Sequence, residues 1–245
     1  MNNQMPDEAS FLASYNPSNF LPVALTVDLV VFAVRHKVLH IALVKRGAHP
    51  FLGSWALPGG FVGPTENALA AAHRELEEET GLNLGSHRVF VEQLATFSDP
   101  GRDPRMRVVS VAHVVLLAAE GGIVPPLCAG SDAAHAQWVP VHTLDTPALA
   151  FDHGEILRQG MERLAGKMEY TTIGARLLPA QFTISALRDV YSAVWQVELP
   201  AGNFTRKIRP SLTSTGVKVQ GVGAPASLFT VGSDWISPPL ARPRR

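Results

Sequence analysis

The chain has 245 residues, of which 46% are hydrophobic and 17% are charged, and its formal net charge at pH 7 is zero. This composition excludes an intrinsically disordered protein, and the length is sufficient for two domains. The single cysteine, Cys128, excludes an intramolecular disulfide and a multi-cysteine zinc site, and it agrees with a reducing, cytoplasmic location.

The charges are divided unevenly along the chain. Residues 1–150 hold 9 Lys and Arg against 14 Asp and Glu (9 − 14 = −5), whereas residues 151–245 hold 12 against 7 (12 − 7 = +5). The acidic part favours metal binding and the basic part favours contact with a polyanion, although chance surface composition gives the same imbalance. We expect no membrane segment, because the longest apolar run has 12 residues and a span needs roughly 18.

In chain order, apolar runs typical of strands alternate with a few helical segments, and a second pattern begins after Pro179. The first part is predicted to contain a flexible tail at 1–20, a β-hairpin from 24–34 and 38–44, a structured loop at 50–63, a helix at 65–80 capped by Thr65, and strands at 89–97, 107–117 and 137–141. A linker helix follows at 151–167. The second part is predicted to contain helices at 184–195 and 201–211 and two strands within 216–231.

The predicted helix at 65–80 carries an unusual group of acidic side chains. Glu75, Glu78 and Glu79 stand at i, i+3 and i+4, which places them on one side of the helix, where like charges repel. A hard divalent cation with oxygen ligands, such as Mg²⁺, removes that repulsion and commonly shares its ligand shell with substrate phosphates. An ordinary acidic surface helix is the alternative reading of the glutamates alone.

The spacing around these glutamates decides between the two readings. Gly60, Glu66, Arg74-Glu75-Leu76, Glu78-Glu79 and Gly81-Leu82 fill all nine specified positions of the 23-residue pattern G-x5-E-x7-R-E-U-x-E-E-x-G-U, in which U is a bulky aliphatic residue. This pattern is the Nudix box, and the chain resembles a Nudix hydrolase from about residue 22 to residue 145.

The resemblance implies a fold, a cofactor and a set of roles. The fold is an α/β Nudix α/β/α sandwich around a mixed sheet, and the family cleaves nucleoside diphosphates linked to another moiety with Mg²⁺ or Mn²⁺ and a water molecule. By resemblance, Glu78 and Glu79 are the principal metal ligands, and Glu75 is either a ligand or orients the water. The carbonyl of Gly60 adds a further ligand. Glu66 and Arg74 hold the geometry of the loop and helix.

The segments that flank the box resemble the branch of the family that handles ADP-ribose. These segments are Lys45-Arg46, 55–62 and 97–105. Arg46, Arg102 and Arg105 are candidates for contacts to phosphate or ribose oxygens, with loop bracing or solvation as the alternative for any one of them. Phe97 or Trp55 is the candidate for stacking on the adenine, and Trp55 is equally well explained as a core residue.

The sequence pattern of the C-terminal part predicts a winged helix-turn-helix domain. In the helix at 201–211, Phe204 and Ile208 form an apolar stripe, whereas the outward positions are Asn203, Arg206, Lys207 and Arg209. A short helix with one apolar stripe and a basic outer face suits a recognition helix that contacts DNA. Winged helices also mediate protein contacts, so these features alone leave both roles open.

Taken together, the two parts resemble the Nudix-related transcriptional regulators of NAD metabolism, with matching segments at 151–157, 166–171 and 203–208. The predicted organisation is a tail at 1–20, a Nudix domain at 21–150, a linker helix at 151–168, a winged helix domain at 169–238 and a tail at 239–245. The resemblance implies a homodimer that binds operator DNA and releases it when ADP-ribose or a related nucleotide binds. Because regulators of this group often have a damaged box and this box is intact, two readings stay open: a regulator that also hydrolyses, or an enzyme whose winged helix serves dimerisation.

Overall fold

The centre of the molecule is a seven-stranded mixed sheet with the main strand order β3-β2-β1-β6-β5, while β4 pairs with β1 and β7 pairs with β2. The structure is a computed structural model that describes residues 7–83, 85, 88–120, 123–130, 133–220, 225–232 and 240–243. The strands are β1 (Ala24–Arg35), β2 (Val38–Arg46), β3 (Trp55–Ala56), β4 (Gly59–Phe61), β5 (Val89–Phe97), β6 (Val108–Leu117) and β7 (Ala133–Pro140).

The strands β1 and β6 form the parallel pair at the middle of the sheet, with register from Ala24↔Val108 to Phe32↔Leu116. The other pairings of this sheet are antiparallel. Both central strands are buried along most of their length, which is why their sequences are almost continuously apolar. The predicted hairpin and central strand are confirmed, and the loop predicted at 50–63 additionally contains β3 and β4.

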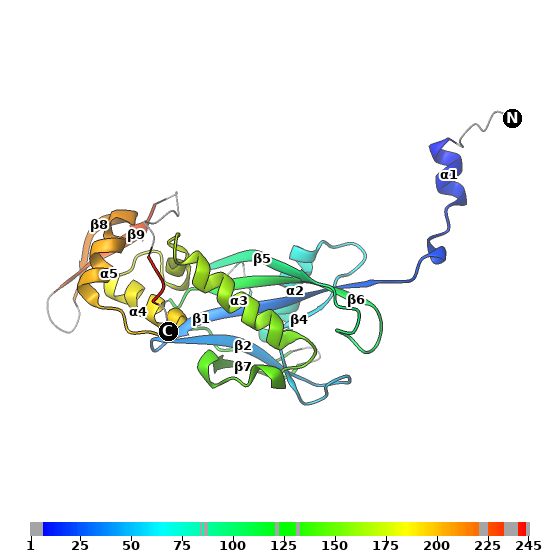
Figure 1. The fold of residues 1–245 in the computed structure, drawn as a ribbon, viewed down its shortest axis with the longest axis horizontal. Coiled ribbons are helices and arrows are strands. Elements are labelled where there is room, and N and C mark those ends of the chain that lie inside the picture. The colour runs from blue at the N-terminus through cyan, green and yellow to red at the C-terminus, as the bar shows by residue number, and fades with distance from the viewer. Residues whose placement is uncertain are drawn as a thin grey trace.

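Helices cover both faces of the sheet, because alternate residues of β1 point to opposite sides. Val27, Leu29 and Val31 pack in the cluster under α2 (Ala68–Thr80). Val30 packs in the second cluster, under α3 (His153–Lys167), where a Cβ on Gly160 would lie 2.9 Å from it. Figure 1 shows the resulting layers, and the predicted α/β/α sandwich is confirmed.

The helix of the acidic cluster begins later than predicted. Asn67, not Thr65, is its N-cap, because the Asn67 side chain accepts a hydrogen bond of 2.9 Å from the amide of Ala70. Glu66 therefore precedes the helix, where its carboxylate accepts a hydrogen bond from the amide of Gly63. The predicted stop is confirmed, since Gly81 ends the helix with φ of 71°.

The C-terminal part folds into the predicted winged helix. It contains α4 (Ile184–Trp195), α5 (Ala201–Ile208) and a two-stranded sheet of β8 (Leu212–Val219) and β9 (Ala226–Val231). The prediction for α5 was three residues too long: the chain continues as a 3₁₀ turn at Arg209–Ser211, where Pro210 cannot donate the helical hydrogen bond. The predicted turn between the strands lies mostly at 221–224, outside the described residues.

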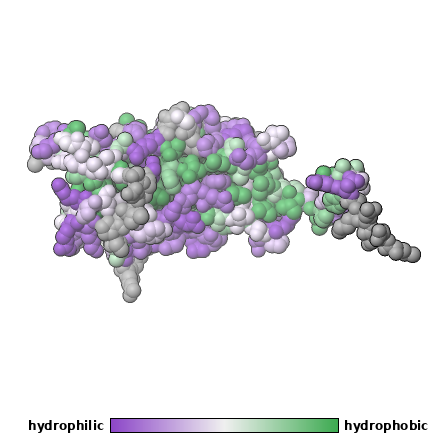
Figure 2. Space-filling model, turned by 90° about the horizontal axis from the view of Figure 1, so that it is seen from above, coloured by the Kyte–Doolittle hydropathy of each residue, from purple (hydrophilic) through white to green (hydrophobic). Residues whose placement is uncertain are grey.

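The N-terminal segment, predicted as a flexible tail at 1–20, contains two short helical elements. It contains α1 (Glu8–Ser14), capped by Asp7, and a 3₁₀ turn at Pro17–Asn19. This arm extends away from the sheet (Figure 1), and Figure 2 shows apolar surface on it, to which Phe11, Leu12, Phe20 and Leu21 contribute. Within the described part of the chain, none of the helices has the length and apolar character that crossing a membrane requires.

Candidate functional site

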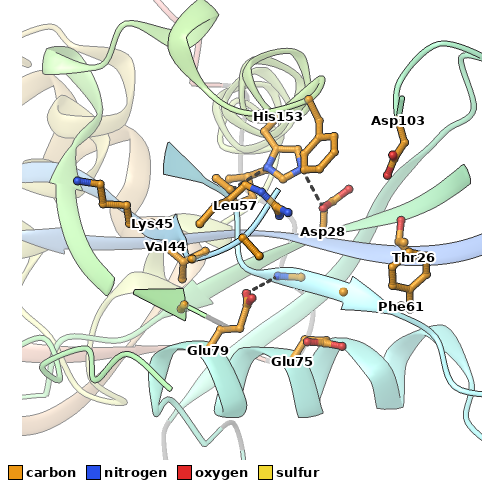
Figure 3. A pocket seen from close by; sticks show the side chains of 18 of the residues that line it. Thr26, Asp28, Val44, Lys45, Leu57, Phe61, Glu75, Glu79, Asp103 and His153 are labelled. Atoms are coloured by element: carbon orange, nitrogen blue, oxygen red, sulfur yellow. Dashed lines mark hydrogen bonds and ion pairs between the residues drawn. The ribbon is translucent and has the colours of Figure 1, made fainter. Parts of the chain in front are cut away.

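The acidic face of α2 and the two glycines of β4 form one wall of a cavity of about 340 Å³. Glu75, Glu78 and Glu79 all line it, so the folded helix brings the three predicted carboxylates to a single space. Figure 3 shows Glu75 and Glu79 pointing from α2 toward β4, with Asp28 and His153 on the other side of that strand. The cavity thus lies where both layers of the sandwich meet one end of the sheet.

Glu79 is the most enclosed of the three carboxylates. Its Oε2 accepts a hydrogen bond of 2.9 Å from the amide of Gly59. Burial raises the pKa of Glu79 to about 7, because it outweighs the hydrogen bond from Gly59, which lowers this pKa, and the neighbouring charge of Glu75 adds to the rise. A positive charge placed beside Glu79 would therefore be strongly favourable.

The two glycines of β4 leave room for close neighbours, which are the backbone of β1 at Gly59 and the carboxylate of Glu75 at Gly60. Gly59 has φ of 155°, and a Cβ at that position would lie 2.1 Å from the carbonyl oxygen of Val27. A Cβ on Gly60 would lie 2.3 Å from Oε1 of Glu75. A side chain at position 59 would push β4 away from β1, whereas a side chain at position 60 would displace the carboxylate of Glu75 from its place in the cavity.

Arg74 joins the loop to the helix through several charge-assisted hydrogen bonds. Its guanidinium donates to Glu66 at 2.7 and 3.2 Å, to Glu75 at 2.7 Å, to Glu78 at 3.0 Å and to the carbonyl of Phe61 at 3.0 Å. Glu66 in turn accepts from the amide of Gly63 at 2.8 Å. One cation therefore fixes both the entry of the loop and the rotamers of two cavity carboxylates.

Cationic side chains also line the cavity. Arg46 and Arg105 line it, and the guanidinium of Arg46 lies 4.9 Å from the ring centroid of Phe151. Arg105 is held by Asp103 at 2.8 Å and lies 5.3 Å from the ring centroid of Phe61. A cavity that combines carboxylates with guanidinium groups suits a substrate that carries phosphates between two polar ends.

A buried ionic network lies behind the cavity. Asp28 on β1 pairs with Arg102 at 3.0 Å and accepts a hydrogen bond of 2.6 Å from Ser110 on β6. Arg102 also donates two hydrogen bonds, of 2.7 and 2.9 Å, to Asp152. Burial raises the pKa of Asp28, but His153, Arg102 and Ser110 outweigh it and bring this pKa down to about 2.

His153 completes this network from the first turn of α3. The amide of Leu57 donates to its Nδ1 at 2.8 Å, so the Nδ1 lone pair is in use and Nε2 carries the hydrogen. Nε2 lies 3.2 Å from Oδ1 of Asp28, which accepts that hydrogen. The ring orientation is thus fixed from both sides by neighbours distant in sequence.

In the winged helix, α5 buries Phe204 and Ile208 and exposes a polar face. All four predicted outward residues, Asn203, Arg206, Lys207 and Arg209, are exposed. Phe204 packs edge-on against Tyr191 of α4, with 5.1 Å between ring centroids. This support leaves the basic face of α5 turned outward, where a partner can reach it.

Comparison with known proteins identifies both parts of the chain. The model of the NUDIX domain matches residues 22–160, which is more than half of the chain. The chain belongs to the Nudix family. A second model, the NrtR DNA-binding winged helix domain, matches residues 174–231 behind the Nudix domain.

Three relatives match this chain over different shares of its length. The "ADPR responsive transcriptional repressor NtrR" of Acinetobacter baylyi is 34% identical over 82% of this chain and 78% of its own length. The crystal structure of Shewanella oneidensis NrtR complexed with a 27mer DNA has a TM-score of 0.73 at 30% identity and covers 88% of this chain and 98% of that chain. An ADP-ribose pyrophosphatase of Methanocaldococcus jannaschii is 39% identical over 58% of this chain and 75% of its own length.

The Nudix cavity contains most of the site residues predicted from the sequence. Arg46, Arg102 and Arg105 line it, although Arg102 is nearly enclosed by its two carboxylate partners. Trp55 and Phe97 are not among the lining residues, and both pack against the hydrophobic core as half-buried side chains. Their predicted stacking role therefore has no support from the cavity geometry.

Among the lining residues that the sequence analysis did not single out are Asp28, Phe61, Phe151 and His153. Asp28 leaves a signal, because it is a charged residue in the middle of the apolar strand β1. The other three leave no such signal, since Phe61 ends the very short strand β4 and Phe151 and His153 stand before and at the start of α3, where no periodic pattern is broken.

Nudix hydrolases use a divalent metal, and the donor chemistry of this cavity fits one. The side chains of Glu75, Glu78 and Glu79 and the carbonyl of Gly60 are hard oxygen donors. In the described ranges no three acidic, histidine or cysteine side chains already converge on one point, and Glu75 and Glu78 both accept hydrogen bonds from Arg74. The raised pKa of Glu79 nevertheless indicates a carboxylate that a cation would stabilise.

Proposed function

We propose that this protein is an ADP-ribose-responsive, DNA-binding regulator whose Nudix domain also hydrolyses ADP-ribose or a related nucleoside diphosphate derivative. One observation carries the proposal. A single cavity joins the three glutamates of the Nudix helix to the cationic side chains of Arg46 and Arg105, on a chain that ends in a winged helix with a basic outer face.

The residues divide the work of recognition. Arg46 and Arg105, which line the cavity, offer charge-assisted hydrogen bonds to phosphate or ribose oxygens. Phe61 and Phe151, which these arginines already contact, replace Trp55 and Phe97 as the candidates for stacking on the adenine. The network of Asp28, Arg102 and His153 closes the rear of the cavity.

The hydrolytic half of the proposal depends on α2. Glu78 and Glu79, with Glu75 and the carbonyl of Gly60, are the ligands proposed for Mg²⁺ or Mn²⁺. When bound, such a cation neutralises the diphosphate and lowers the pKa of the attacking water. Arg74 and Glu66 keep the helix and loop in register, so their contribution is to position the carboxylates.

The DNA-binding half depends on α5. Asn203, Arg206, Lys207 and Arg209 form one exposed face, and the wing strands β8 and β9 lie next in the chain. This is the arrangement of a recognition helix that enters the major groove of an operator. The repressor name of the Acinetobacter relative and the DNA complex of Shewanella NrtR support this reading, in which a homodimer binds a palindromic operator.

A purely enzymatic pyrophosphatase is the alternative function, with the winged helix serving dimerisation. The complete Nudix box favours it, because a sensor needs to bind nucleotide but does not need every position for chemistry. The two functions make opposite predictions for DNA and the same prediction for ADP-ribose.

One pair of measurements on the full chain separates them. The first follows AMP release from ADP-ribose with Mg²⁺ or Mn²⁺, with Glu79→Gln as the inactive control. The second measures fluorescence anisotropy of DNA duplexes that the wild-type protein selects from a random library, with and without ADP-ribose. Hydrolysis of ADP-ribose without selection of any DNA sequence would support the purely enzymatic function. DNA binding that ADP-ribose does not weaken would contradict the proposed regulatory function. A dimer mass in light scattering is expected.

A further inference from the structure

The wall of the nucleotide cavity and the start of α3 are the same piece of chain. Phe151 and His153 both line the cavity, and α3 begins at His153. Phe151 has φ of 53°, a left-handed conformation that is rare for a bulky residue and is held only by its surroundings. Any change in the cavity that moves these side chains therefore acts directly on the first turn of α3.

Asp152, between these two residues, has an unusual role for a helix N-cap. An Asp at this position normally accepts hydrogen bonds from the first amides of its own helix, but here the side chain makes no capping bond. Its two oxygens instead accept from Arg102, at 2.7 and 2.9 Å. Arg102 in turn lines the cavity and pairs with Asp28. The carboxylate of Asp152 thus links the start of α3 to the cavity residue Arg102 and does not cap the amides of α3.

The other end of α3 is tied to the winged helix. Nε1 of Trp195 on α4 donates a buried hydrogen bond of 3.1 Å to the carbonyl of Ala165 on α3. Trp195 and Tyr191 meet edge-on with 5.0 Å between ring centroids, and Tyr191 supports Phe204 of α5 in the same way. An unbroken set of packed contacts therefore runs from α3 to the basic face of α5.

Between its ends α3 is held close to the sheet as a single rigid element. Its 15 residues form a continuous α-helix, and Gly160 lets its backbone approach Val30 of β1, the strand that also carries Asp28. Near its C-terminal end, Arg163 and Lys167 pair with Glu92 of β5. A helix anchored in this way responds to a change at one end by a shift as a whole, as packed helices do in two-state switches.

We propose that Asp152 is the joint through which occupancy of the nucleotide cavity reaches the recognition helix. This inference rests on the proposed function and specifies its regulation. Arg102 is shared between Asp28 and Asp152, and an anionic ligand in the cavity brings a third negative group toward it. Redistribution of Arg102 loosens its double hydrogen bond to Asp152, α3 shifts, and the Trp195–Ala165 contact transmits that shift to α4 and α5.

The test measures coupling and not binding alone. The quantity is the ratio of DNA dissociation constants with and without a saturating methylene-bridged ADP-ribose, which cannot be hydrolysed, in Mg²⁺. Coupling is reciprocal, so the same ratio must appear when DNA weakens binding of the nucleotide analogue. The variants are Asp152→Asn, which keeps size but removes the charge, and Asp145→Asn, the same change at an exposed position nearby.

We expect the ratio to fall at least fivefold in Asp152→Asn and to remain at the wild-type value in Asp145→Asn. An unchanged ratio in Asp152→Asn would overturn the inference. If the nucleotide analogue does not change the DNA dissociation constant of the wild-type protein, the proposed function itself would be overturned. If Asp152→Asn does not fold by circular dichroism, Trp195→Phe takes its place, because it removes the indole donor to Ala165 and keeps an aromatic ring beside Tyr191. Full coupling in Trp195→Phe would likewise overturn the inference.

Discussion

The backbone amide of Leu57 donates a hydrogen bond of 2.8 Å to Nδ1 of His153, a residue 96 positions further along the chain. This bond fixes the tautomer of the ring and directs Nε2 to Asp28. The loop that precedes the Nudix glycines is therefore fastened to the helix that leads into the winged helix.

Replacement of His153 tests this fastening. His153→Ala leaves the Leu57 amide without its acceptor and removes one donor from buried Asp28, so we expect a loss of about 2–4 kcal/mol in the free energy of unfolding. Urea denaturation measures it, with His142→Ala as the control at an exposed position. A loss below about 0.5 kcal/mol, typical of surface changes, would show that the bonds contribute little.

Acid stability reports on Asp28. Its pKa is lowered from 3.8 to about 2 in the folded protein, so its ionisation stabilises the fold above pH 3.8 and this contribution disappears as the pH falls toward 2. The difference corresponds to about 2 kcal/mol. Urea midpoints between pH 5 and pH 2 should therefore fall more steeply in the wild type than in Asp28→Asn, whose position no longer titrates. Parallel curves would contradict this assignment.

Metal binding should release a proton from Glu79. Because burial raises its pKa to about 7, much of this carboxyl is protonated at pH 6 in the metal-free protein, and a cation must displace that proton. Calorimetry of Mn²⁺ binding in two buffers with different ionisation enthalpies measures the release, which should shrink as the pH rises above 7. Glu79→Gln should bind metal without this release and lose AMP production by at least two orders of magnitude. Equal heats in both buffers at pH 6 would contradict the prediction.

Contacts to DNA should depend on the exposed face of α5. Arg206→Ala and Lys207→Ala are expected to weaken DNA binding, and each lost phosphate contact should lower the slope of log K against log salt by about 1. Arg158→Ala removes an equally exposed arginine from α3 and serves as the matched control. If the control weakens binding as much as Arg206→Ala does, net charge and not the helix face would account for the effect.

The sequence alone determined the elements whose chemistry is local. The Nudix box follows from residue types at fixed spacing along one loop and one helix, so spacing alone assigns Glu75, Glu78 and Glu79 to one helix face, whatever the rest of the chain does. The amphipathic pattern of α5 identified its exposed residues for the same reason, because helical periodicity alone decides which side faces out.

Only the tertiary structure decided what lies around the box. For Arg102 the sequence left open a substrate contact and a bracing role, and in the folded protein its guanidinium pairs with Asp28 on β1 and with Asp152 at the start of α3. Trp55 and Phe97 pack into the core, whereas Phe61 and Phe151 face the cavity. These assignments depend on contacts between segments that are distant in sequence, and the spacing of residues along the chain does not show which of those segments come together.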